Sequence, residues 1–226
     1  MTRACFPVPG EPNQAYFFHG ATYAKIKFTP STNDDEVIFG PTDIAKEWKT
    51  LVQAGFSTVD AALPVPGKPD EVYFFSGTRY VRIKFVPSSP EESIVFGPAN
   101  IADHWKSLIK AGFQTVDAAF PVPGHEGEAY FFSGANYAKI RFTPSSDDDV
   151  VTFGPTNTAG QWKTLNEAAF DTIDAVLPVP GKPGQAYFYS GSQYVKIEFV
   201  PSSGTEKIAY GPARLYKLWK SLAWGW

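Results

Sequence analysis

The sequence has few of the residues that build disulfides and metal sites. Its 226 residues include one cysteine, one methionine and three histidines. A single cysteine, Cys5, excludes an intrachain disulfide, and we interpret it as a small buried apolar residue. The histidines, His19, His104 and His125, do not share a spacing suited to a metal, and no serine or cysteine nucleophile accompanies them. We therefore expect no enzymatic activity.

Long apolar runs and an excess of positive charge are also missing. No run approaches the ~20 residues of a membrane span. The first seven residues do not have the apolar stretch of a secretory signal, so we expect a protein that is cytoplasmic or secreted without a conventional leader. The formal net charge is −3, with both signs interspersed. Because nucleic-acid affinity rests on clustered Lys and Arg, nucleic acid is not an expected partner.

The sequence does contain a repeat of 57 residues. Tyrosine recurs at this interval, and so does tryptophan: Tyr23, Tyr80, Tyr137 and Tyr194; Trp48, Trp105, Trp162 and Trp219. A fixed period of this size is typical of modular arrays and rings. We expect one domain over residues 1–226, made of units 1–56, 57–113, 114–170 and 171–226. The hydrophobic content of 43% is enough for a core that the units share.

The second unit illustrates the organisation of all four. Alternating apolar residues and turn residues predict strands over 58–63, 71–75, 80–85 and 93–96, stopped by Pro64 at the first and by Gly97-Pro98 at the last. One short helix should follow, with Ile101, Trp105, Leu108 and Ile109 on its apolar face. Each unit is thus a four-stranded antiparallel meander plus a short helix.

Four such units favour a closed ring, an all-β four-bladed propeller, over an open solenoid. A solenoid has atypical polar caps at its ends. Here the first and last units keep the same apolar helix pattern: Ile44, Trp48 and Leu51; Leu215, Trp219 and Leu222.

The units resemble the hemopexin-like repeat over the whole chain. The motif is an Asp-Ala-Ala strand, an aromatic strand, a Gly-x-x-Tyr hairpin with a basic residue two positions on, and Gly-Pro before a helix with Trp. The second unit carries it as Asp60–Ala62, Tyr73–Phe75, Gly77–Tyr80 with Arg82, and Gly97-Pro98 before Trp105. The resemblance implies a propeller that binds rather than catalyses, as haem carriers, protease modules and seed albumins that bind polyamines or haem do. The first unit departs from the motif, with Arg3 in place of Asp, and the disulfide usual between first and last blades is impossible.

The innermost strands of a propeller leave one edge of backbone groups facing the central channel. A ring of carbonyl oxygens there suits a hard cation such as Ca²⁺. The resemblance points to the same place and implies a structural ion held by backbone carbonyls, with a second ion layer one residue on. The positions are Arg3, Asp60, Asp117 and Asp174, then Ala4, Ala61, Ala118 and Ala175. A channel that contains only water is the alternative.

The third strand carries a polar stripe. Tyr80, Arg82 and Lys84 alternate with apolar residues, so they share one face. A tyrosine beside a long cation can form a pocket for a sugar or an anion; the alternative is packing between blades, with the charged ends reaching solvent. The candidate ligand-binding residues are Tyr23, Lys25, Tyr80, Arg82, Tyr137, Lys139, Tyr194 and Lys196.

The likeness of the four units favours a lectin-like protein that binds carbohydrate or another small polar ligand at several equivalent sites. Such repetition raises avidity by about 10²–10⁴ without new contacts. Recent duplication would also leave the units alike. The alternatives are a protein with one haem or polyamine ligand near the axis and a scaffold for another protein. A homodimer is compatible with each.

Overall fold

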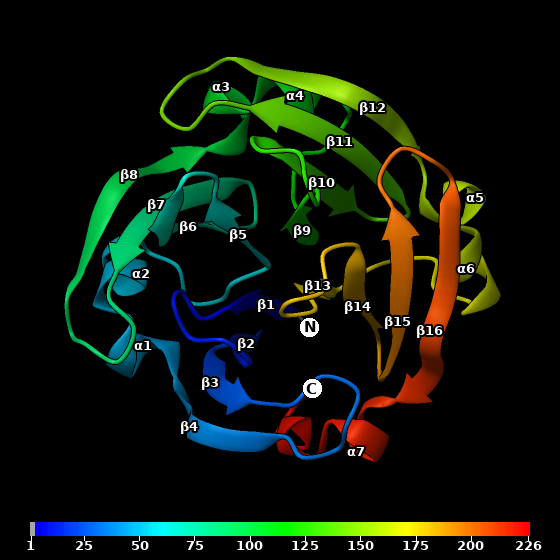
Figure 1. Ribbon diagram of the computed structural model, residues 1–226. Coiled ribbons are helices and arrows are strands. Elements are labelled where there is room, and N and C mark those ends of the chain that lie inside the picture. The colour runs from blue at the N-terminus through cyan, green and yellow to red at the C-terminus, as the bar shows by residue number, and fades with distance from the viewer. Residues whose placement is uncertain (1–2) are drawn as a thin grey trace.

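The computed structural model describes residues 3–226 and contains four antiparallel four-stranded sheets arranged as a ring (Figure 1). Each sheet is one blade, with its strands paired in chain order. The strands are β1 (Arg3–Pro7), β2 (Gln14–His19), β3 (Thr22–Lys27) and β4 (Glu36–Asp43); β5 (Ala61–Val65), β6 (Lys68–Ser76), β7 (Arg79–Phe85) and β8 (Glu92–Asn100); β9 (Ala118–Pro121), β10 (Glu128–Ser133), β11 (Asn136–Phe142) and β12 (Asp149–Asn157); β13 (Ala175–Pro178), β14 (Gln185–Ser190), β15 (Gln193–Val200) and β16 (Thr205–Arg214).

The first strand of every blade lies at the centre of the ring. β1 is adjacent to β5, β5 to β9, β9 to β13, and β13 to β1 again. The fourth strands lie at the rim (Figure 1). The prediction of a closed four-bladed propeller is confirmed, and the alternative prediction of an open solenoid is wrong.

The strands of blade two have other bounds than predicted, and two of them continue through turn residues. β5 continues through Pro64 to Val65, because Pro64 pairs with Val72 and the strand needs no donor from it. β8 likewise continues through Gly97-Pro98, where a bulge interrupts the pairing with β7. Gly97 takes φ +86°, and a Cβ there would lie 3.0 Å from the Tyr80 carbonyl oxygen. Only glycine fits this close approach of two backbones.

The expected single helix is two short pieces in each blade. They are α1 (Ile44–Glu47) and α2 (Lys49–Gln53), α3 (Ile101–His104) and α4 (Lys106–Lys110), α5 (Thr158–Gln161) and α6 (Lys163–Glu167), and α7 (Leu215–Leu218) with the 3₁₀ turn η1 (Lys220–Leu222). The break falls at the tryptophan, where Trp105 has φ −104° and ψ 68°. Ile109, placed on the apolar face by the prediction, is 40% exposed because the break rotates α4 relative to α3. No helix within residues 3–226 is long and apolar enough to span a membrane.

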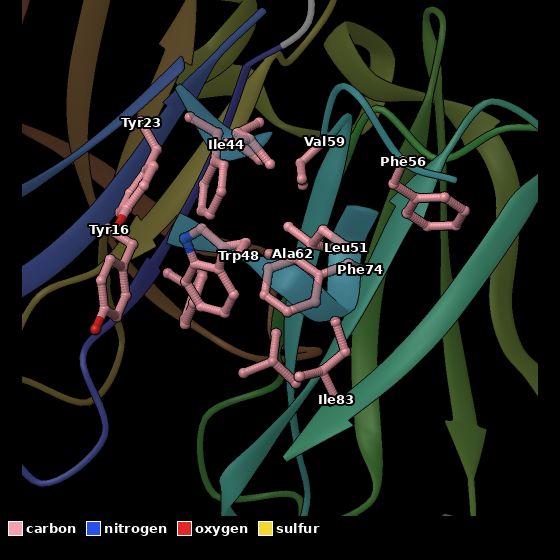
Figure 2. Packing of buried hydrophobic residues seen from close by; sticks show 14 of the residues in the cluster. Tyr16, Tyr23, Ile44, Trp48, Leu51, Phe56, Val59, Ala62, Phe74 and Ile83 are labelled. Carbon is pink, nitrogen blue, oxygen red and sulfur yellow. The ribbon is translucent and has the colours of Figure 1, made fainter. Parts of the chain in front are cut away.

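The hydrophobic core lies between blades rather than within them. Each of four clusters combines residues from two adjacent blades, the last joining blade four to blade one. In the first cluster, Trp48 lies against Phe74 of the next blade, with ring centroids 5.4 Å apart (Figure 2). The ring of Phe85, also of the next blade, lies 5.1 Å from that of Trp48. A blade cannot bury its apolar faces alone, which explains why the ring must close. Cys5 is buried and free, as expected.

Candidate functional site

Four pockets lie at equivalent places, one at each junction between neighbouring blades. Their volumes are about 530 Å³ between blades one and two, 290 Å³ between two and three, 360 Å³ between three and four, and 150 Å³ between four and one. All eight predicted ligand-binding residues line them, two in each: Tyr23 and Lys25, Tyr80 and Arg82, Tyr137 and Lys139, Tyr194 and Lys196.

In each pocket the cation of one blade donates a hydrogen bond to a serine of the next. The donor–acceptor pairs are Lys25 Nζ to Ser88 Oγ (2.8 Å), Arg82 Nη1 to Ser145 Oγ (2.9 Å), Lys139 Nζ to Ser202 Oγ (2.8 Å) and Lys196 Nζ to Ser31 Oγ (2.6 Å). All four serines have left-handed backbone, with φ between 62° and 72°. Sequence reasoning missed the serines as site residues, although the Pro-Ser pair recurs in every unit.

Aromatic side chains form the pocket walls. The Tyr80 ring stacks on Phe96 at 5.8 Å, and the Tyr194 ring stacks on Tyr210 at 5.9 Å. Burial, followed by the charge of Glu206, raises the pKa of Tyr137 to about 12. A tyrosine with so high a pKa keeps its hydroxyl proton near neutral pH and can donate it to a ligand. Sequence reasoning also missed the fourth-strand aromatics as site residues, although an aromatic residue recurs there in every unit: Phe39, Phe96, Phe153 and Tyr210.

One carboxylate in each pocket is held at the start of the second helical piece of the preceding blade. Glu92 accepts hydrogen bonds from the backbone N–H and hydroxyl of Thr50, at 3.1 and 2.8 Å. Asp149, Glu206 and Asp35 bond the corresponding backbone N–H groups in the other three junctions. These carboxylates therefore join blades, because each accepts a backbone N–H of the preceding blade.

The alternative in which the charged ends reach solvent is wrong for Arg82 and Lys196, which are 6% and 7% exposed. Arg82 is neutralised by Glu71, with Nε and Oε2 2.8 Å apart and both side chains enclosed. In the third blade, Lys139 lies 3.6 Å from Oε2 of Glu128 on the neighbouring strand. Arg82 and Lys139 are thus fixed parts of their pocket walls, each held by a carboxylate of its own blade and a serine of the next.

The predicted ion positions lie on the central strands or directly before them: Arg3 and the four alanines are within the strands, and Asp60, Asp117 and Asp174 each precede one. Within residues 3–226 no additional strand pairs with the axial edges of β1, β5, β9 and β13, so their carbonyl groups suit a hard cation. The aspartate carboxylates are engaged elsewhere: Oδ2 of Asp60 accepts from the Gly77 N–H at 2.6 Å, and Asp117 and Asp174 make the same bond in their own blades. No group of three or more His, Cys, Asp or Glu side chains in this part of the chain could hold a metal.

Arg3 differs from the three aspartates in its charge and also in the blade that its side chain contacts. Its guanidinium reaches blade four, where it pairs with Asp174 and donates to the Gly191 carbonyl. The side chain also lies over the Trp226 ring, 5.7 Å from its centroid. The positive charge of Arg3 is therefore balanced by Asp174.

A separate apolar cavity of about 470 Å³ opens at the channel mouth, among the ends of the central strands. Its walls include equivalent residues of all four blades: Cys5, Ala62, Ala119 and Val176; Pro7, Pro64, Pro121 and Pro178. None of the histidines lines it. His19 ends β2, His104 ends α3 and His125 precedes β10, so the three belong to different blades.

The comparisons with known proteins agree with this architecture. No family model matches the chain. Albumin-2 of Pisum sativum is 25% identical over 211 residues, 93% of this chain and 90% of the relative. A plant lectin with two metal-binding sites from Cicer arietinum has a TM-score of 0.85 and 26% identity, covering 97% of this chain and 95% of that one. The hemopexin-fold protein CP4 from cow pea has a TM-score of 0.84 and 25% identity, covering 97% and 95%. The chain therefore has the four-bladed β-propeller fold of the hemopexin type.

Proposed function

We propose that this chain is a non-enzymatic, lectin-like protein that binds carbohydrate in the four pockets between its blades. The observation that carries the proposal is the repetition of one lining at every junction: tyrosine, a cation, tryptophan, and a serine from the neighbouring blade. Pockets with aromatic walls and a few convergent polar groups are typical ligand sites. The structural likeness to the Cicer arietinum lectin supports the same function.

The arrangement gives each polar group a role. The aromatic walls offer apolar area for the flat face of a sugar ring, while tyrosine hydroxyls, lysine ammonium groups and serine hydroxyls hydrogen-bond its oxygens. Four weak sites around one ring allow a single molecule to contact several glycans, which raises its avidity for a cell surface.

The test begins with a glycan array and continues by calorimetry with the best ligand. We expect a stoichiometry near four in the wild type and near three in Tyr137→Phe, because that change removes one pocket hydroxyl and keeps its ring. Tyr216→Phe is the matched control, since Tyr216 is 59% exposed and lines none of the four pockets. An array with no bound glycan would overturn the proposal.

We propose in addition that a structural Ca²⁺ binds in the axial channel through main-chain carbonyls of Arg3, Asp60, Asp117 and Asp174, with Ala4, Ala61, Ala118 and Ala175 forming a second layer. The unpaired strand edges support it, because oxygen-only donors suit Ca²⁺. A chelator should lower the melting temperature, and added Ca²⁺ should restore it by mass action. A melting temperature that changes with neither the chelator nor Ca²⁺ would contradict the proposed ion site.

The cavity at the channel mouth favours one second function, the binding of a single apolar ligand such as haem. Its walls are mainly proline, valine, alanine and phenylalanine, with Lys182 and Gln185 as the polar residues, and they suit a flat apolar ring better than a polyamine. Titration with hemin should then give a saturable one-to-one absorbance change. A linear, unsaturable response would exclude it.

A further inference from the structure

The four pockets share a cation but differ in the residue that neutralises it. The position at the start of the second strand is Gln14, Glu71, Glu128 and Gln185 in the four blades. Glu71 pairs with Arg82 and Glu128 with Lys139. Glutamine carries no charge, so the cations of blades one and four have no such partner.

Lys196 of blade four is the more enclosed of these two lysines. It is 7% exposed, and its only hydrogen bond within the described residues is the one to Ser31 Oγ at 2.6 Å. In this part of the chain no carboxylate lies within ion-pair distance of its ammonium group. Burial, followed by the charge of Lys182, lowers the pKa of Lys196. A buried charge with a neutral partner is costly, and a bound anion would offset that cost.

Two tyrosine hydroxyls of this pocket can donate to a ligand. The Tyr187 hydroxyl accepts the Ser31 N–H at 3.2 Å, which leaves its own proton free. Within residues 3–226 the buried Tyr194 hydroxyl makes no hydrogen bond. Asp35, the one carboxylate of the lining, already accepts the backbone N–H groups of Lys220 and Ser221, at 3.2 and 2.6 Å.

The pocket thus combines one unneutralised cation, two hydroxyl donors and aromatic walls. Its volume is about 150 Å³, and a cavity of about this size can hold benzene, so it admits the carboxylate end of a sugar whose other end lies outside. We propose that the pocket between blades four and one binds an acidic saccharide, with Lys196 pairing with the carboxylate of the sugar. This inference rests on the proposed carbohydrate function and names the ligand class of one of its four sites.

The neighbouring blades supply the variants that test it. Gln185 donates to Glu198 at 3.0 Å, so a carboxylate at 185 needs a compensating change at 198. Blade two has Glu71 and Lys84 at these two positions. The double variant Gln185→Glu/Glu198→Lys therefore rebuilds the arrangement of blade two and gives Lys196 a carboxylate. Glu198→Lys alone is the matched control, because it leaves Lys196 unneutralised.

Calorimetry is carried out with methyl glucuronide, with its neutral counterpart methyl glucoside, and with acetate as the bare carboxylate. In the wild type and in Glu198→Lys we expect one site per chain that binds glucuronide about tenfold or more tighter than glucoside, since a charge-assisted pair adds about that much. In the double variant the preference should disappear while glucoside binding is unchanged. Lys196→Met should also remove the preference, which keeps the test valid if the double variant does not fold.

Each outcome separates this inference from the proposed function. Equal binding of the two glycosides by the wild type, or a preference that survives in the double variant, overturns the acidic site and leaves the lectin function standing. Binding of acetate alone, abolished in the double variant, overturns the acidic saccharide as the ligand and leaves the glycan array to decide the lectin function. A wild type that binds none of the three probes overturns the acidic site, and the glycan array again decides the lectin function.

Discussion

Arg3 and Asp174 form the ion pair that joins the first blade to the last, with Nη1 and Oδ2 3.3 Å apart. The two residues occupy the same position of their respective units, yet they carry opposite charge. Asp60 and Asp117, which occupy that position in the middle blades, bond only within their own blade. The one departure from the repeat at this position therefore lies where the ring closes, and it connects two blades that no disulfide can link.

Replacing Arg3 with alanine should weaken ring closure. The change removes the pair with Asp174 and the contact with Trp226, and we expect a loss of about 1 kcal/mol, or roughly 2–4 °C in melting temperature for a chain of this length. Calorimetric melting measures it. Lys46→Ala is the control, because its pair with Asp43 is exposed and should contribute almost nothing. Equal shifts in the two variants would contradict a role for Arg3 in closure.

Trp226 should contribute more than Arg3. Its ring packs on Phe17 and Tyr189, with centroids 5.0 and 5.2 Å away, and its indole N–H donates to the Phe18 carbonyl at 3.0 Å. Trp226→Ala should cost about 2 kcal/mol, below the range for a fully buried tryptophan because this ring is only partly enclosed. Urea denaturation gives the value. The control Tyr216→Ala changes an exposed residue and should leave the urea midpoint unchanged. If Trp226→Ala left the midpoint unchanged as well, Trp226 would not stabilise the ring.

Glu71→Ala should destabilise blade two strongly. It leaves the Arg82 guanidinium enclosed with no carboxylate, and breaking a buried pair from one side costs about 3 kcal/mol. Lys84→Ala breaks the exposed pair with Asp70 on the same two strands and should cost far less. Denaturation midpoints of the two variants provide the comparison, and a cost of Glu71→Ala no larger than that of Lys84→Ala would refute it.

His19 should make stability depend on pH. Burial, followed by the charge of Arg3, lowers the pKa of His19. The folded state therefore favours the neutral ring. The stability that His19 contributes is fully present above the unfolded pKa of about 6.5 and is lost as the pH falls below that value. The equivalent residues are Ser76, Ser133 and Ser190. Between pH 7 and 5 the unfolding free energy of the wild type should fall more steeply than that of His19→Ser; parallel curves would rule this out.

Most of the fold could be predicted from periodicity. Tyr80, Trp105 and their equivalents recur without slippage, and a unit of this size cannot bury its aromatic residues alone, so neighbours in a ring follow. The helix break at Trp105 could not be predicted, because Ile101, Leu108 and Ile109 fit an unbroken helix equally well. The continuation of β8 through Gly97-Pro98 could not be predicted either, because glycine and proline ordinarily end strands. The requirement for glycine at position 97 comes from the close approach of the Tyr80 carbonyl, which only the structure shows.

By itself the sequence determined that four equal units share one core and that a tyrosine and a cation recur on the same face of each third strand. Only the tertiary structure decided what those side chains meet. Lys196 bonds Ser31, 165 residues away, because the ring brings the last blade against the first. Periodicity records which residues are equivalent, but not which of them face one another across two blades. Strand register and ring closure determine that, and with it which cations are neutralised and which are left for a ligand.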